Sequence, residues 1–134
     1  MAANFEIKIA DNSDELKTLL ENASKKALMR CGMQGAEMVA DVTHVQGGLL
    51  RNSITYALGG ESAAKGSYKS DDGKTSGTYD GKAPDDGQPS VYIGTNVEYA
   101  VIEETKPGHS YLKRGLQNSA STFKRILEDE LKNA

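Results

Sequence analysis

The two histidines, His44 and His109, are the side chains in this sequence best suited to acid–base catalysis or metal binding near neutral pH. They stand far apart in the chain, without clustered acidic residues at the spacing of a metal-ligand set. A serine hydrolase would need a nucleophile as well, and the sequence contains no G-x-S-x-G elbow. We therefore expect no catalytic site, no metal and no cofactor, and a hydrolase or toxin-like enzyme that uses a histidine is kept as a rival hypothesis.

Several acidic residues occur in pairs. The stretches 71-DDG-73 and 85-DDG-87 share aspartates and glycine with calcium loops, but they lack the alternating ligand order and the closing glutamate. Turn formation by Asp and Gly explains them better. Glu103 and Glu104 are adjacent, so on a helix their side chains point in different directions and do not converge as an acid–base pair.

Two dense, irregular stretches remain, at residues 47–54 and 91–104. Glycines in both permit tight turns and close approach of backbones. Both also carry polar side chains that are able to cap helix ends or to reach across an interface, namely Arg51, Asn52, Ser53, Thr95 and Asn96. Tyr99 and Glu103 are four residues apart, which places them on one face of a helix. Two interpretations stay open: internal turn architecture and an interaction surface.

The chain has 134 residues, 37% of them apolar and 26% charged, which fits one globular domain over residues 1–134. We find neither an apolar run of membrane-spanning length nor a signal peptide, so we expect a cytoplasmic, non-membrane protein. Cys31, the single cysteine, excludes a disulfide within the chain and is expected to be buried. The net charge of −3 gives no general attraction to nucleic acid, but Lys113 and Arg114 are local candidates for DNA contact.

Alternating apolar and charged residues predict a strand at residues 4–10. Its apolar side is formed by Phe5, Ile7 and Ile9. A long helix is predicted from about residue 13 to residue 42, because apolar residues recur along one stripe. For Gly32 and Gly35 inside this helix, three explanations compete: close packing against a sheet, a kink, or a break into two helices. We favour one helix, bent near Gly32.

Two more strands are predicted at residues 54–58 and 90–95, followed by a short helix at 97–104 and a long one at 111–134. Between the strands, the glycine-rich stretch 59–89 has too few large apolar side chains to fold by burial. A stretch of this length is either functional or disordered. One structure that it could adopt is an extended hairpin whose tip is mobile until a partner binds it.

This order of elements predicts an α+β fold, with a small antiparallel sheet of about three strands packed on one face by two long helices. The other face, which carries Glu6, Lys8, Thr55 and Tyr92, is expected to be free for solvent or a partner. The edges of such a sheet need a cover, and another subunit is one cover.

The stretch 43-THVQGGLLRNSI-54 resembles a motif of the gene-product-ten-like tail-component family of tailed bacteriophages, written P-V-D-T-G-x-L-R-x-S-I. The matching positions are Val45, Gly48, Leu50, Arg51, Ser53 and Ile54. Positions that depart from the motif are His44, Gln46 and Gly47, where the family has proline, aspartate and threonine.

The stretch 91-VYIGTNVEYAVIEE-104 is similar to a second motif of that family, V-x-I-G-T-x-x-x-Y-A-x-x-x-E-x-G. Its matching positions are Val91, Ile93, Gly94, Thr95, Tyr99 and Ala100, and Glu103 lies one residue before the position of the motif's glutamate. A looser similarity to P-F-L-R-P-A-L, which opens the last helix of the family, runs through Tyr111, Leu112 and Leu116.

The resemblance implies a virion structural protein, not an enzyme, at the head–tail junction: a neck, tail-completion or tail-terminator component assembled in the cytoplasm of the host bacterium. Such proteins form rings, such as hexamers or dodecamers, around the DNA passage. They bind adjoining neck, connector or tail-tube proteins, contact passing DNA without specificity and involve no membrane. The motif positions Gly48, Leu50, Arg51, Ser53, Gly94, Thr95, Tyr99 and Glu103 are then interface candidates, and residues 59–89 are a candidate docking arm. The rival is a non-viral protein-interaction adaptor of the same fold class.

Overall fold

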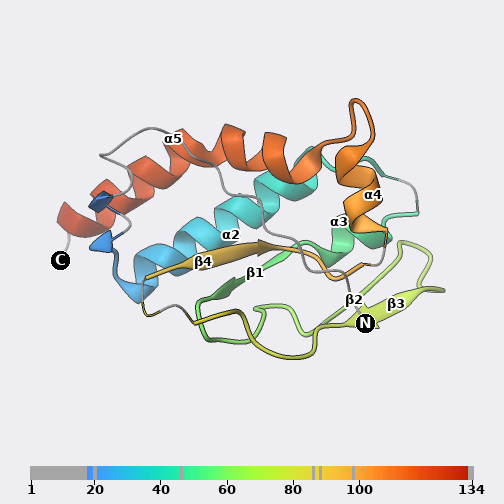
Figure 1. Cartoon of the computed structure of the whole chain (residues 1–134), viewed down its shortest axis with the longest axis horizontal. Coiled ribbons are helices and arrows are strands. Elements are labelled where there is room, and N and C mark those ends of the chain that lie inside the picture. Colours follow the sequence, from blue (N-terminus) through green and yellow to red (C-terminus); the bar gives the residue numbers. More distant parts are fainter. Residues whose placement is uncertain are drawn as a thin grey trace.

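The computed structural model describes residues 18–132, apart from residues 20, 46, 86, 88 and 98. The fold class is α+β, as predicted (Figure 1). Two long helices, α2 (Lys25–Asp41) and α5 (Tyr111–Lys132), lie side by side, and α2 covers a sheet made of β1 (Thr55–Leu58) and β4 (Val91–Gly94). The predicted strand at residues 4–10 lies outside the described residues.

The remaining elements gather at one end of the molecule (Figure 1). They are two short helices, α3 (Leu49–Ser53) and α4 (Ala100–Thr105), and a separate hairpin of β2 (Ser67–Lys69) and β3 (Ser76–Thr78). None of the described helices is long and apolar enough to cross a membrane.

Helix α2 begins directly after Ser24, whose hydroxyl accepts a hydrogen bond from the backbone N–H of Ala27 at 3.1 Å. Ser24 has extended backbone angles, and residues 22–24 are not helical, so the prediction of one continuous helix from residue 13 is wrong. The predicted end is confirmed, because α2 stops at Asp41. Cys31 is buried as expected, and burial raises the pKa of its thiol to about 11.

Gly32 and Gly35 are both buried in the middle of α2, which continues through them. A Cβ atom on Gly32 would overlap the ring of Tyr56, and one on Gly35 would overlap Ile93 and Phe123. Of the three explanations for these glycines, close packing against the sheet is therefore confirmed, and the predicted bend near Gly32 is not needed to explain them.

Helix α5 begins where the carboxylate of Glu104 accepts hydrogen bonds from the N–H groups of Leu112 and Lys113, at 2.8 and 3.2 Å. A negative charge at this end also interacts favourably with the helix dipole. Leu127 is buried in this helix, whereas Leu131, one turn later, is 46% exposed. Leu127 packs with Ala27 in the first turn of α2, so the next turn of α5 reaches past that helix.

Strands β1 and β4 pair antiparallel, from Thr55 opposite Gly94 to Leu58 opposite Val91, which confirms the predicted pairing of these two segments. Thr55, however, is only 8% exposed, so it does not lie on a free sheet face as expected. Its hydroxyl accepts a hydrogen bond from the N–H of Lys65, and the N–H of Ala64 donates to the carbonyl of Tyr56. The stretch after β1 therefore folds back over Thr55 and the outer edge of β1.

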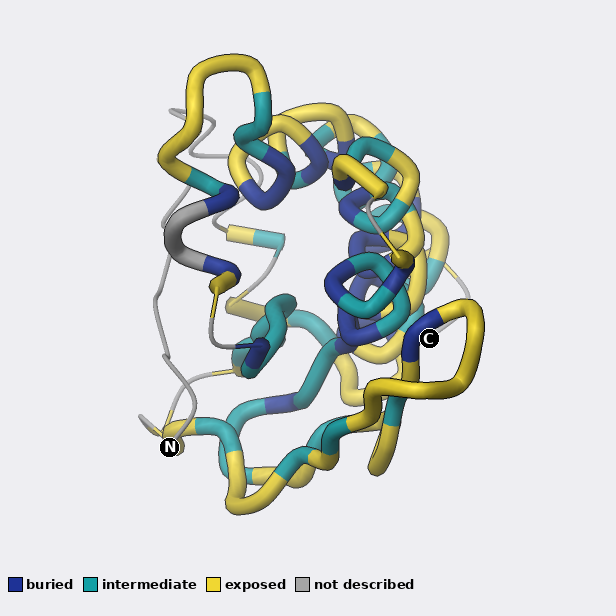
Figure 2. Tube along the Cα trace, turned by 90° about the vertical axis from the view of Figure 1, so that its right-hand side faces the viewer, coloured by how far each residue is buried: buried dark blue, intermediate teal, exposed yellow. Residues whose placement is uncertain are grey.

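The glycine-rich stretch at residues 59–89 contains the β2–β3 hairpin, in which Ser67 pairs with Thr78 and Lys69 with Ser76. Most of its residues are exposed, whereas buried residues concentrate on the facing sides of α2 and α5 (Figure 2). The stretch thus forms a folded element with little apolar burial.

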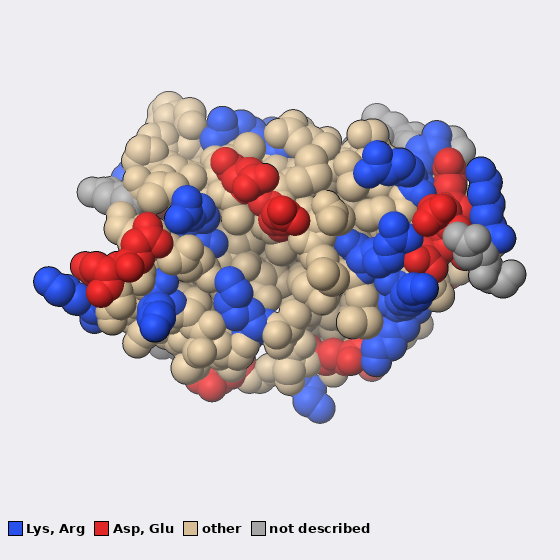
Figure 3. All heavy atoms as spheres, turned by 180° about the vertical axis from the view of Figure 1, so that it is seen from behind, with Lys and Arg blue, Asp and Glu red and all other residues tan. Residues whose placement is uncertain are grey.

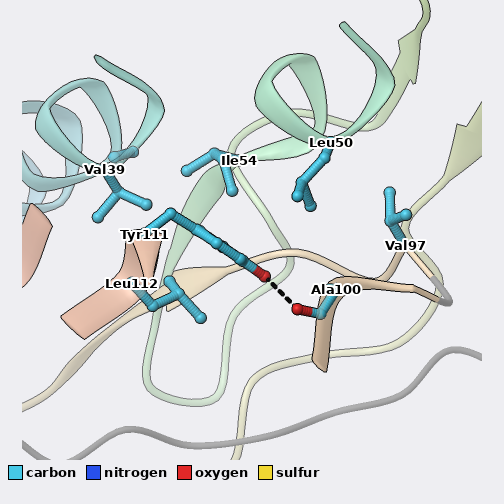
Figure 4. Packing of buried hydrophobic residues seen from close by; sticks show 8 residues of the cluster. Val39, Leu50, Ile54, Val97, Ala100, Tyr111 and Leu112 are labelled. Carbon is cyan, nitrogen blue, oxygen red and sulfur yellow. Dashed lines mark hydrogen bonds between the residues drawn. The ribbon is translucent and has the colours of Figure 1, made fainter. Parts of the chain in front are cut away.

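The core beside the short helices is built around Tyr111, which is fully buried. Its ring lies among Val39, Leu50 and Ile54, and its hydroxyl donates a 2.9 Å hydrogen bond to the carbonyl of Ala100 (Figure 4). This bond joins α5 to α4, and burial raises the pKa of the phenol.

Candidate functional site

The two dense stretches of the sequence meet where α3, the end of β4 and the β2–β3 hairpin come together. We call this place the motif junction. It consists of Gly48, Asn52, Ser53, Tyr68, Asp71, Tyr79, Thr95 and Asn96, which come from three separate parts of the chain.

Gly48 precedes α3 and has a φ of +83°, a left-handed conformation that glycine adopts without strain. Its carbonyl accepts the N–H of Asn52 at 2.9 Å and so starts the helix. A Cβ at this position would overlap the carboxylate of Asp71. Gly48 therefore serves two needs, a backbone turn and the close approach of the hairpin.

Ser53 and Thr95 connect the two motif stretches through a chain of hydrogen bonds. The Ser53 hydroxyl donates to the carbonyl of Leu50 at 2.6 Å and lies 2.5 Å from the Thr95 hydroxyl. A serine hydroxyl has one proton, so Thr95 is the donor in that second bond. Thr95 in turn accepts the N–H of Val97 at 3.1 Å. Because Ser53 is fully buried, each of these groups depends on its protein partner.

Two tyrosines of the hairpin reach this pair. Their rings lie 5.1 Å apart in a tilted arrangement. Tyr68 donates a 2.5 Å hydrogen bond to the side-chain carbonyl of Asn96, whose amide donates to the backbone of Thr78 at 2.7 Å. The hydroxyl of Tyr79 is buried and makes no hydrogen bond to a described residue. Burial raises the pKa of Tyr79, while the nearby hydroxyls of Ser53 and Thr95 act in the opposite direction.

The hairpin is held on α3 mainly through Asp71. The amide of Asn52 donates to the Asp71 carboxylate and to the carbonyl of Lys69, both at 2.9 Å. Backbone adds to this, since the N–H of Asp71 donates to the carbonyl of Gly47 at 2.9 Å. Arg51 lies 3.6 Å from the same carboxylate, and both side chains are about half exposed.

Tyr99 and Glu103, predicted to share a face of one helix, have different surroundings. Tyr99 is 37% exposed. Glu103 is 9% exposed, and its carboxylate lies 3.0 Å from the ring nitrogen of His109 and 2.9 Å from the Lys106 ammonium. The bond to His109, and then that from Lys106, hold the pKa of Glu103 below its ordinary value.

His44 and His109, far apart in sequence, stack with ring centroids 4.5 Å apart. This contact joins the segment after α2 to the segment before α5. In the described part of the chain, no three His, Cys, Asp or Glu side chains are grouped so that they could hold a metal ion.

The two candidate DNA contacts are both exposed on α5, but they differ in their partners. The guanidinium of Arg114 donates to the carbonyl of Val42 at 3.0 Å and to that of Ser110 at 2.6 Å, so it ties α5 to the end of α2. Lys113 instead donates its backbone N–H to the Glu104 carboxylate at 3.2 Å. On the face shown in Figure 3, basic and acidic side chains are interspersed.

Of the eight candidate positions, the structure places Gly48, Leu50, Arg51, Ser53, Gly94 and Thr95 in or beside the motif junction, with Tyr99 and Glu103 on the α4 side. Leu50 is a core residue, 3% exposed. Sequence reasoning missed Tyr68 and Tyr79, because single aromatic residues in a polar, glycine-rich stretch give no periodic signal.

No protein-family model, no curated protein and no solved structure matches this chain. A functional proposal therefore rests on the motifs and on the geometry of the described residues.

Proposed function

We propose that this protein is a structural subunit of a tailed-bacteriophage particle. It acts at the head–tail junction as a neck, tail-completion or tail-terminator component, and it works as a ring of identical copies around the DNA passage. In this proposal it binds copies of itself and adjoining neck, connector or tail-tube proteins, and it performs no catalysis.

The observation that carries the proposal is the hydrogen-bond chain from Val97 through Thr95 and Ser53 to Leu50. It joins the two stretches that resemble the phage family, although more than 40 residues separate their serine and threonine. Positions matched from one motif thus contact positions matched from the other. Two motifs that belong to one shared architecture must make such contacts. Two short stretches that are similar by chance need not.

Exposed apolar side chains are consistent with contacts between copies. Met29 and Met33 are 41% and 56% exposed and lie one turn apart on α2, and Val45 and Tyr99 are exposed as well. Adjacent exposed apolar residues are favoured where a neighbouring molecule covers them. A ring needs contacts of this kind on two different surfaces of each subunit.

The proposal is tested by inactivating the gene in the phage or prophage that encodes it and examining the lysate by electron microscopy. We expect DNA-filled heads and tails that fail to join, and gold-labelled antibodies that mark the neck of complete particles. Mature particles that lack the protein, or that join normally without it, would contradict the proposal.

The candidate docking arm is tested by a deletion whose end points follow from the structure. The N–H of Tyr79 donates to the carbonyl of Gly66 at 3.1 Å, so residues 67–78 can be removed and the ends rejoined. We expect the shortened protein to fold but not to join heads to tails, while replacing the exposed turn at residues 72–75 with glycine and serine is the length-matched control. Normal joining by the shortened protein would exclude the arm.

Two rivals predict different results. For a non-viral adaptor of this fold, we expect a monomer at every concentration that never associates with portal or tail proteins. For a histidine-dependent hydrolase, replacing His44 and His109 abolishes activity, and the Glu103–His109 contact is the observation that favours testing it. Phage assembly that is unaffected by both replacements excludes catalysis by these residues.

A further inference from the structure

The outer edge of β4 has no strand beside it among the described residues, whereas its inner edge pairs with β1. The direction of each backbone group follows from the pairing. The N–H of Gly59 donates to the carbonyl of Ser90, so in an antiparallel ladder Tyr92 and Gly94 also point toward β1. The N–H and C=O groups of Val91 and Ile93 therefore point outward.

The opposite edge of the sheet confirms this alternation. There the carbonyls of Tyr56 and Leu58, the partners of Ile93 and Val91, accept hydrogen bonds from Ala64 and Glu61. The edge of β1 is thus covered by the chain itself. An open edge on β4 is the kind of surface that proteins usually cover or block, because it pairs readily with other strands.

The helix layer is wider than the described two-stranded sheet. α2 packs on both strands, whereas α5 packs along α2 and against α4. Neighbouring helices lie about 8–10 Å apart and neighbouring strands about 4.8 Å apart, so two helices cover more width than two strands fill. α5 lies on the β4 side, because Phe123 and Ile93 both reach the space above Gly35. Its sheet-side residues Leu116 and Phe123 are only half buried.

We propose that the outer edge of β4 is a strand-acceptor site and that its occupant is the N-terminal segment of the same chain, residues 4–10. The alternation of this segment places Phe5, Ile7 and Ile9 on one side, where they would pack beneath α5, with Glu6 and Lys8 on the other.

The length of the intervening chain allows this. Leu19 and Phe123 both pack against the cluster between α2 and α5, so the described chain begins at the helix layer. Residues 11–17 separate it from the segment, and an extended stretch of that length reaches about 25 Å. In this proposal the segment covers an edge that would otherwise be open to pairing with another chain. This inference does not depend on the proposed function.

Residue-resolved hydrogen exchange of the full-length protein tests the site directly. We expect the Val91 and Ile93 amides to be protected, and removal of residues 1–12 or Ile7→Asp to speed their exchange by about tenfold or more. Lys8→Ser is the matched control, because it changes the opposite side of the segment, and should leave exchange unaltered. The Tyr92 amide, which is bonded to β1, should stay protected in every variant.

Three results would overturn the inference. The first is free exchange of Val91 and Ile93 in the full-length protein. The second is protection that survives both the truncation and Ile7→Asp. The third is protection that falls on dilution, since that identifies a second copy of the chain as the occupant. Protection that is independent of concentration and is lost in both variants supports the proposal.

Discussion

Two parts of this molecule, the α2–α5 helix pair on its β1–β4 sheet and the β2–β3 hairpin on α3, are stabilised by different kinds of contact. The helix pair buries apolar side chains such as Val39 and Leu127 almost completely. The hairpin is held by backbone pairing and by polar side chains, chiefly Asn52 and Asp71. Apolar burial tolerates little change of volume, whereas exposed polar contacts add small increments that water can partly replace. We therefore expect substitutions in the two parts to differ in size of effect.

The largest effect is expected for Leu127→Ala in the cluster between α2 and α5. Leu127 is 1% exposed, so its truncation leaves a cavity and should lower the free energy of unfolding by about 2–5 kcal/mol. Leu131→Ala, one turn later at a side chain 46% exposed, is the control and should cost much less. Chemical denaturation measures both. Equal losses would show that the helix pair does not end where the structure places it.

The next largest loss of stability is expected for Gly115→Ala, although alanine has a higher helix propensity than glycine. A Cβ there would overlap the backbone of Val39, so the helices must move apart, at about 1–3 kcal/mol. Gly66→Ala, where no atom lies within 4 Å of the added Cβ, should be nearly neutral. Thermal unfolding compares them. A stabilised Gly115→Ala protein would contradict the close approach of α2 and α5.

A smaller loss is expected for Ser53→Ala at the motif junction. It removes the bonds to Leu50 and Thr95 and leaves a buried carbonyl with one partner fewer, at about 1–2 kcal/mol. The exposed Ser67→Ala in β2 is the control. Denaturant unfolding should separate them. Indistinguishable variants would mean that the hydrogen-bond chain between the motif stretches is not a stabilising feature.

In the hairpin, Asp71→Ala should loosen the contact with α3 while leaving global stability nearly unchanged, because the carboxylate is largely exposed. Amide exchange should rise within residues 66–79 and stay constant in α2. Asp80→Ala, at an exposed position after β3, is the control. Faster exchange in α2 as well would show that the hairpin and the helix pair open together.

The smallest effect is expected on the stability of the fold at acidic pH. The folded-state pKa of Glu103 lies below its ordinary value of 4.5. Its ionised form therefore stabilises the fold above that value, and the contribution is lost as the pH falls through the lowered folded pKa. Glu103→Gln should reduce the pH dependence of the unfolding midpoint on the acid side. An unchanged acid limb would show that the contacts with His109 and Lys106 do not favour the ionised form.

The same contrast explains which elements were predictable. The apolar stripe of α5 and the alternation at Tyr56 and Leu58 are periodic, so these elements were predicted close to their observed bounds. The start of α2 was placed too early, because the apolar stripe continues through residues 22–24, where only the Ser24 cap marks the break. The hairpin lacks a periodic apolar signal, and its strands of three residues each were not predicted individually.

Of the candidate site, the residue types were visible in the sequence, but their partners were not. Gly48 was recognised as a turn glycine, while its contact with Asp71 depends on where the hairpin folds. Arg114 was read as a basic surface residue, yet its guanidinium bonds the carbonyl of Val42. Pairings of this kind join residues with no regular spacing, so no local pattern encodes them.

The sequence by itself determined the fold class, the long helix α5 and the antiparallel pairing of the segments that became β1 and β4, because each follows from local periodicity and short-range punctuation. Only the tertiary structure decided that Ser53 bonds Thr95, that His44 stacks on His109, and that the hairpin folds onto α3. These contacts depend on how packed elements orient distant side chains, and that orientation is set by burial across the whole domain.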